Sequence, residues 1–265
     1  MTLEVHVIGI GLLGPGFADW ARARPLLIDP ATWQRATTVV PAPGRLPPTE
    51  RRRAGTVVKA SLVVADEAVA TAAGHAGADA ATLPTVFSSS TGDPVNCHLL
   101  CEALALPQRA VSPTRFTNSV HNAPAGYWHI AAASRAPSTS LAAFDASFGA
   151  GLLEAAVQCQ ATQAPVLLVA CDVPYPEPLH AKRPVADTFA LALILAPGGG
   201  RELHIGLAPG ATETLCPHTG LEDLRRTIPA ARALPLLQAL ASDVASTVVL
   251  EAAPGLAMQI AVARR

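Results

Sequence analysis

The chain has 265 residues, of which 50% are hydrophobic and 15% are charged, and its formal net charge is −1. This length and apolar content are sufficient for a large domain with a sizeable core. The balanced charge argues against a nucleic-acid or anionic-lipid partner, since both require a basic surface. Because few charges are available to cover the surface, we expect exposed apolar area that a partner protein covers.

Five scattered cysteines predict reduced thiols and a cytoplasmic location, because their number is odd and most lie in apolar runs. They are Cys97, Cys101, Cys159, Cys171 and Cys216. Cys97 and Cys101 flank His98 at a spacing that raises the question of a metal site. Without a second Cys/His pair at ligand spacing, we predict neither a metal nor a cofactor.

The N-terminal segment is apolar but too short to span a bilayer, and it lacks the basic region of a signal peptide. We interpret residues 3–10 as a strand that ends in a glycine-rich turn. Gly9, Gly11 and Gly14 have the spacing of a dinucleotide-binding loop. Pro15 follows directly, and no strand ending in an acidic residue arrives about twenty residues later, so we favour the simple turn.

The next hundred residues alternate helical and apolar segments. A helix over 17–28, broken at Pro25, precedes a proline-rich loop at 41–48. One long helix is expected over 50–75, capped by Thr49 and beginning with three arginines. A buried strand over 83–88 and a helix over 95–104 follow. Asn118 or Ser119 then caps a helix that extends to about residue 133.

Residues 137–172 contain a strand, a tight turn, a helix and a second strand. The strands are expected at 138–144 and 166–171, and the helix at 148–160. Many α/β enzymes place a nucleophile at such a turn, where the helix N-terminus stabilises negative charge. Asp145 occupies this turn, and the chain contains no G-x-S-x-G motif for a serine hydrolase. Further strands at 188–195, 202–207, 247–251 and 258–263, with a helix at 231–242, indicate an α/β fold.

Several stretches resemble one family when they are taken together. They are LPPTERRRAGTVVKASLVVADEA, VFSSSTGD, SPTRFTNSVHNAPAGYWHIA, and STSLAAFDASFGAGLLEA followed by PVLLVACDVPYPEPL. The sequence resembles the ketosynthase part of the thiolase-like superfamily. It is most similar to the short ketosynthase-like chain length factors of aryl polyene and xanthomonadin-type pigment pathways. With the first strand and the ALALILAP segment, the resemblance extends to about residue 197.

The resemblance implies a thiolase-like α/β fold, essentially one ketosynthase half with a mixed sheet flanked by helices. Residues 1–197 would form the beta-ketoacyl synthase N-terminal-like domain, and residues 198–265 a short C-terminal completion packed on the same domain. In a condensing ketosynthase the acyl-accepting cysteine lies at the position of Asp145, and a carboxylate cannot form the thioester. Nothing in 198–265 matches the motifs of the two ketosynthase histidines, so His204 and His218 are assigned to surface or core positions.

The resemblance therefore implies a non-catalytic chain length factor. It would form a heterodimer with a full-length ketosynthase and meet an acyl carrier protein transiently, in type II polyketide or aryl polyene biosynthesis. Pairing would occur through the strand at 137–144, which makes a sheet continuous across both subunits. The expected interface and acyl-tunnel residues, with Val111 as a further candidate, are Phe116, Asn118, His121, Asn122, Thr139, Leu141, Phe144 and Phe148.

Other interpretations remain open at this point. Asp145 is expected to cap the following helix rather than to act chemically, and Phe116 is equally compatible with ordinary core packing. A rival function is a stand-alone acyl hydrolase or decarboxylase in which Asp145 works with His121 or Asn118. A third is a carrier-protein docking module, which would use the basic cluster of Arg51, Arg52, Arg53 and Lys59.

Overall fold

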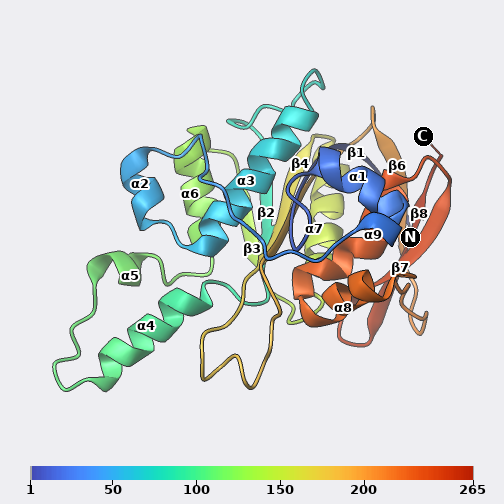
Figure 1. Cartoon of the computed structure of the whole chain (residues 1–265). Helices are drawn as coiled ribbons and strands as arrows, with labels where there is room; N and C mark the ends of the chain where they lie inside the picture. The colour runs from blue at the N-terminus through green and yellow to red at the C-terminus, as the bar shows by residue number, and fades with distance from the viewer. Residues whose placement is uncertain (1, 265) are drawn as a thin grey trace.

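The computed structural model describes residues 2–264, and these form one eight-stranded sheet flanked by helices (Figure 1). The strand order is β3-β2-β4-β5-β1-β6-β8-β7. The strands are β1 (Thr2–Leu13), β2 (Thr85–Ser88), β3 (Ser138–Leu141), β4 (Val166–Asp172), β5 (Phe189–Ala196), β6 (Arg201–Leu207), β7 (Ser246–Ala253) and β8 (Leu256–Val262).

The helices occupy the segments between these strands. They are α1 (Trp20–Ile28), α2 (Pro48–Arg53), α3 (Thr56–Thr71), α4 (Pro94–Ala105), α5 (Pro113–Thr117), α6 (Ala123–Ala132), α7 (Ser147–Thr162), α8 (Thr219–Thr227) and α9 (Leu234–Ala241), with short 3-10 turns at Pro30–Thr32 and Pro229–Ala233. Pro25 lies inside α1 without breaking it, contrary to the expectation from the sequence. Within the described part of the chain, no helix is both long and apolar enough to cross a membrane.

The sheet is mixed: β3, β2 and β4 are parallel to one another, and the remaining neighbours are antiparallel. β2 pairs in parallel with β3 and β4, and helices form the crossovers between these strands. β5 then pairs antiparallel with both β4 and β1. Every residue of β4 and β5 is buried, as their continuous apolar sequences predict for strands covered on both faces.

Helix α7 lies on one face of the sheet and also packs against β7. A Cβ atom at Gly149 would collide with the carbonyl oxygen of Glu251 in β7. A Cβ atom at Gly151 would come within 2.8 Å of the Ser88 Cβ atom in β2. The two glycines therefore allow α7 to pack closely against both β7 and β2. This close packing fixes the position of the helix N-terminus and of the turn before it.

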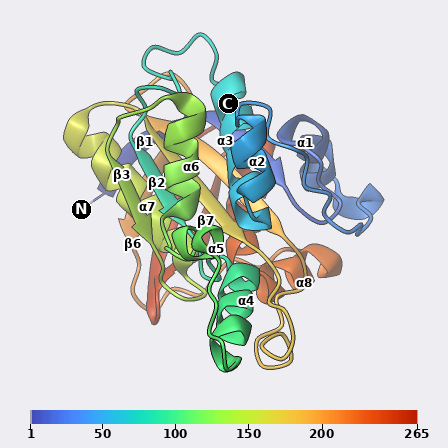
Figure 2. The ribbon, with the colours of Figure 1, turned by 90° about the vertical axis from the view of Figure 1, so that its left-hand side faces the viewer.

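The other face of the sheet carries α3 and α6 (Figure 2). Gly9 and Gly11 lie inside β1, where added Cβ atoms would collide with the Ala68 and Val64 carbonyl oxygens of α3. The predicted strand end at residue 10 is therefore wrong, because β1 continues to Leu13 and includes Gly11. The function of the two glycines is to let the strand and the helix approach closely.

The expected helix over 50–75 is divided into α2 and α3 at Gly55. Asp93, from a distant segment, lies against Gly55 so closely that a Cβ atom there would meet its carboxylate. Thr49 is also not the cap, since α2 begins at Pro48 without a side-chain cap. The break falls at Ala54 and Gly55, whose backbones are extended, and the absence of a Cβ atom at Gly55 leaves room for the Asp93 carboxylate.

Helices α4 and α5 project away from the sheet and form an arm, defined here as residues 94–120 (Figures 1 and 2). Their mutual contacts are few, and α4 has only two buried residues, Pro94 and Asn96. Several large apolar side chains of the arm are exposed: Val95, Leu104, Leu106, Phe116 and Val120. The arm therefore presents apolar surface that the chain itself leaves uncovered.

Candidate functional site

The turn between β3 and α7 has a defined backbone geometry. β3 ends at Leu141, earlier than predicted, and Phe144 adopts a left-handed conformation with φ of 51°. The Ser147 hydroxyl accepts a hydrogen bond from the Ala143 amide and donates one to the Phe144 carbonyl oxygen, at 2.9 and 2.6 Å. These bonds hold the strained residue and fix the direction in which Asp145 projects.

Asp145 does not cap α7. The cap position is Ala146, and no side chain accepts a hydrogen bond there, so the capping prediction is wrong. The carboxylate instead accepts hydrogen bonds from Arg183 at 2.8 Å and from Arg232 at 3.2 Å, one on each oxygen. Two cations thus engage a side chain that is still 36% exposed.

Each of these arginines has further partners. Arg183 also donates to the Ser90 hydroxyl at 2.6 Å, and its guanidinium carbon lies 3.9 Å from the centroid of the Phe144 ring. Arg232 also pairs with Glu251 in β7. The arginines come from positions 38 and 87 residues after Asp145, and no sequence motif indicated them.

A buried carboxylate shapes the loop that supplies Ser90. Asp172, at the end of β4, accepts hydrogen bonds from the backbone amides of Ser90 and Thr91 at 2.7 and 2.9 Å. The Ser89 hydroxyl donates to the same oxygen at 3.2 Å. Burial raises the pKa of Asp172, while these hydrogen bonds oppose that shift. No motif in the sequence indicated this role for Asp172, which orders the loop beside the turn.

Among the residues expected at an interface, three lie between the end of α5 and the start of α6. His121 is exposed, and its Nε2 atom lies 3.2 Å from the Ser89 carbonyl oxygen. Asn122 is exposed at the start of α6 and makes no side-chain cap. Asn118 is buried; it donates to the Arg53 carbonyl oxygen at 3.1 Å and accepts from the Tyr127 hydroxyl at 3.1 Å. Asn118 therefore joins the arm to the body, whereas His121 and Asn122 face outward.

Phe116 and Phe148 lie in opposite environments. Phe116 in α5 is 69% exposed, so the core-packing interpretation of this residue is wrong. Phe148 in α7 is only 1% exposed and belongs to the core. Phe144 is 61% exposed beneath Arg183.

Thr139 and Leu141 lie in β3, which is an edge strand of the sheet. Both are partly buried, and Thr139 accepts a hydrogen bond from Gln158 at 3.0 Å. The carbonyl groups of Pro137 and Leu141 point towards β2, where they accept from Thr85 and Ser89. In a parallel pair the alternate residues, Ser138 and Ser140, point their backbone groups outward. Among residues 2–264 these outer groups have no partner strand.

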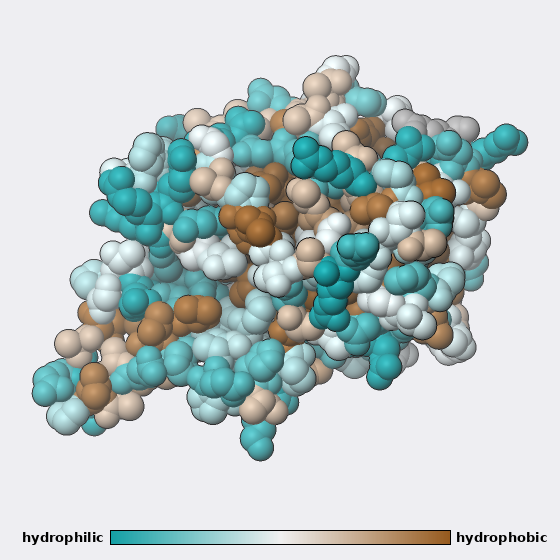
Figure 3. Space-filling view, in the orientation of Figure 1, coloured by the Kyte–Doolittle hydropathy of each residue, from teal (hydrophilic) through white to brown (hydrophobic). Residues whose placement is uncertain are grey.

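The exposed apolar residues of the arm are visible as brown groups over α4 and α5 (Figure 3).

The basic cluster considered for carrier docking comprises Arg51, Arg52, Arg53 and Lys59. Arg51 donates to the Leu46 carbonyl oxygen, and Arg53 pairs with Glu50. Those bonds already engage two of its four members. The apolar residues of the arm and the outer edge of β3, in contrast, are left uncovered by the described part of the chain.

No cysteine occupies the turn, and the five thiols are free. Cys159 lies inside α7, where burial raises its pKa to about 11. Burial raises the pKa of Cys216 to about 12, and it raises that of Cys171 further. Because the thiolate is the nucleophilic form, these buried thiols are poor acyl acceptors.

The sheet order, the enclosed helix α7 and the turn before it define a thiolase-like ketosynthase fold. A profile of the family described as beta-ketoacyl synthase, N-terminal domain, matches residues 23–250. The chain therefore belongs to this family. A search of curated proteins found no match.

Similar solved structures have the same fold. A chain of the ketosynthase (ApeO) in complex with its chain length factor (ApeC) from Xenorhabdus doucetiae has a TM-score of 0.73 at 21% identity, over 98% of this chain and 99% of that one. A chain of the ishigamide ketosynthase/chain length factor has a TM-score of 0.71 at 13% identity, over 99% of both chains. A beta-ketoacyl synthase from Burkholderia phymatum STM815 has a TM-score of 0.66 at 12% identity, over 99% of this chain and 100% of that one. At these identities the likeness establishes the fold.

Proposed function

We propose that the chain is a non-catalytic chain length factor that forms a heterodimer with a full-length ketosynthase and shapes its acyl tunnel. The observation that carries this proposal is Asp145 at the nucleophile turn, held by Arg183 and Arg232. A carboxylate cannot supply the thiolate that accepts an acyl group, and both oxygens of this one are already engaged by arginines. The pathway is proposed to be of the aryl polyene or a related polyketide type.

The open edge of β3 supports strand pairing with a partner. An unpaired strand edge invites association, and the outward backbone groups of Ser138 and Ser140 offer two donors and two acceptors. The projecting arm lies beyond this edge and adds apolar area, so edge pairing would cover two exposed features together. The solved complexes of similar fold pair a ketosynthase with a chain length factor.

In this heterodimer Phe116 would form part of the floor of the partner's tunnel. Its ring is 69% exposed on a short helix of the arm, so it is free to enter a partner's cavity. A bulky side chain at the end of a tunnel limits how far an acyl chain extends. The carrier protein would deliver acyl groups to the partner and meet this chain only transiently.

The alternative, an acyl hydrolase or decarboxylase with Asp145 and His121 as acid and base, has weaker geometric support. General acid–base catalysis requires groups within hydrogen-bond reach of each other or of the reacting atoms. Asp145 is bonded to two arginines, and His121 to the Ser89 carbonyl oxygen. Both side chains would have to leave their present partners before acting together.

Co-expression with a ketosynthase, followed by light scattering and a condensation assay, tests the proposal. We expect a one-to-one complex whose condensing activity disappears when the ketosynthase cysteine is replaced by alanine. The same ketosynthase without this chain is the control for chain-length distribution. A purified chain that elongates or hydrolyses acyl groups with no partner would contradict the proposal.

A further inference from the structure

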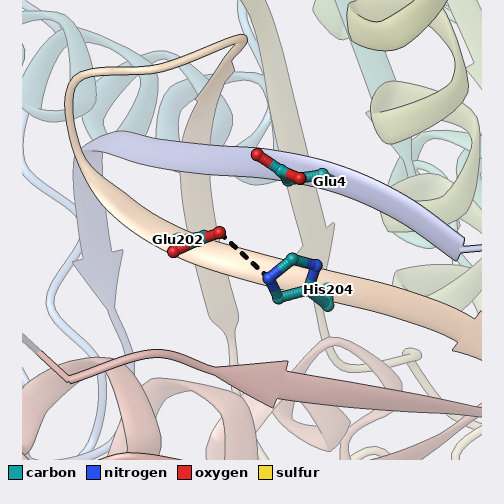
Figure 4. Close-up of side chains that lie close together, drawn as sticks. All are labelled: Glu4, Glu202 and His204. Carbon is teal, nitrogen blue, oxygen red and sulfur yellow. Dashed lines mark ion pairs between the residues drawn. The ribbon is translucent and has the colours of Figure 1, made fainter.

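Two histidines and two glutamates form a compact group on β1 and β6, far along the sheet from β3. The register pairs Glu4 with His204 and His6 with Glu202. Residues at alternate positions of a strand face the same side, and the intervening residues, such as Val5 and Leu203, are buried in the core. All four side chains therefore project from the other face. Figure 4 shows three of them side by side.

The donor atoms of this group are close together. One donor atom each from Glu4, Glu202 and His204 lies within 4.8 Å of the others. His204 Nε2 is 2.9 Å from Glu202 Oε1, and His6 Nε2 is 3.9 Å from Glu4 Oε1. Ligand atoms about 2.0–2.1 Å from a tetrahedral zinc ion are about 3.3 Å apart. Small side-chain rotations would bring the donors to this spacing.

The surroundings favour a ligand role for His6. Its Nδ1 atom lies 3.4 Å from the Gly200 carbonyl oxygen, and its Nε2 atom lies on the side of Glu4, 3.9 Å from Oε1. A histidine ligand commonly has its second nitrogen fixed in this way. On the neighbouring strands Ala196 lies opposite His6 and Ala261 lies opposite His204. The residues paired directly with the two histidines are therefore small.

We propose that Glu4, Glu202 and His204, with His6 as a fourth ligand, form a site for a divalent transition-metal cation, of which Zn²⁺ is the best match. Imidazole nitrogens combined with carboxylate oxygens suit this class, whereas Mg²⁺ and Ca²⁺ prefer oxygen ligands alone. A divalent cation would also offset the repulsion between two carboxylates on adjacent strands. The bound ion would join β1 to β6 and so tie the first strand to the C-terminal part of the sheet.

The experiment uses the full chain without an affinity tag, carrying Cys97→Ser and Cys101→Ser, because these exposed thiols beside His98 also attract zinc. Titration with Zn²⁺ by calorimetry should give one ion per chain and a higher melting temperature. Co²⁺ should give the intense visible absorption of a tetrahedral site. His204→Ala and Glu202→Gln should each weaken binding by about tenfold or more.

His180→Ala, at a distant histidine, is the matched control and should bind Zn²⁺ as the parent does. All variants are compared by circular dichroism in metal-free buffer, since substitutions at these exposed positions should leave the fold intact. Equal Zn²⁺ binding by the parent and the His204→Ala variant would overturn the proposal. So would the absence of stoichiometric binding and of any shift in melting temperature, which would leave the four side chains as cross-strand ion pairs only.

Discussion

Arg183 donates a 2.8 Å hydrogen bond to Asp145, and its guanidinium carbon lies 3.9 Å from the centroid of the adjacent Phe144 ring. The arginine belongs to the proline-rich segment between β4 and β5, and its side chain reaches the turn before α7. One side chain thus contacts two successive residues of the turn. In the function proposed above, this turn corresponds to the position at which a condensing ketosynthase carries its nucleophile. The contacts of Arg183 hold the turn in place, and substitutions at Arg183 and Asp145 test their contribution.

Replacing Asp145 by alanine should leave product formation by the heterodimer largely intact. The substitution removes two partly exposed ion pairs, so we expect the free energy of unfolding to fall by about 1 kcal/mol. Product yield and denaturant unfolding are the measurements. Loss of turnover from a complex that still assembles would instead favour a chemical role for the carboxylate.

Arg183→Ala should loosen the segment that covers the turn. The variant loses the bonds to Asp145 and Ser90 and the contact with Phe144, so residues 173–188 should become more sensitive to limited proteolysis. The neighbouring Lys182 is exposed, and Lys182→Ala is the control that should behave as the parent. Equal cleavage rates in the two variants would show that Arg183 does not hold this segment.

Ser140→Pro tests the open edge of β3. The outward amide of Ser140 is removed, while the bonds of the flanking residues to β2 remain, and proline is tolerated at strand edges. We expect a folded chain that co-purifies poorly with its ketosynthase. Ser140→Ala keeps the amide and should pair normally. A proline variant that assembles as well as the alanine variant would exclude this edge as the interface.

Phe116→Ala should shift the products of the complex towards longer chains. Because the ring is 69% exposed, its removal should leave the free energy of unfolding nearly unchanged. Mass spectrometry of the released products is the measurement. Leu207→Ala, which truncates a similarly exposed apolar side chain on β6, should leave the product length unaltered. Identical product profiles for both variants would remove Phe116 from the tunnel floor.

Thiol alkylation should separate exposed from buried cysteines. At pH 8 a thiol with a pKa of about 11 is ionised in only about one molecule per thousand, so Cys159 should resist iodoacetamide in the folded chain. Cys171 and Cys216 should resist for the same reason, whereas the exposed Cys97 and Cys101 should react. Peptide mapping before and after unfolding measures this. Rapid native labelling of Cys159 would reopen the possibility of an acyl-accepting thiol.

Much of the fold could be predicted from local patterns. The apolar runs at 166–171 and 188–195 became β4 and β5, buried on both faces because helices α3 and α7 pack against these strands. The single helix over 50–75 was wrong, since the backbone is extended at Ala54 and Gly55, where Gly55 leaves room for the Asp93 carboxylate from a distant segment. Propensity along the chain contains no information about such a contact.

The sequence by itself determined that a carboxylate stands at residue 145, between a strand and a helix, because residue type and local period are properties of the chain alone. Only the tertiary structure decided what surrounds it. Arg183 and Arg232 reach Asp145 from 38 and 87 residues away, from the segment between β4 and β5 and from the turn at Pro229–Ala233. The same holds for Glu4 and His204, which become neighbours through the pairing of β1 with β6. The pairing of distant strands brings these side chains together, and the spacing of residues along the chain does not predict which strands pair.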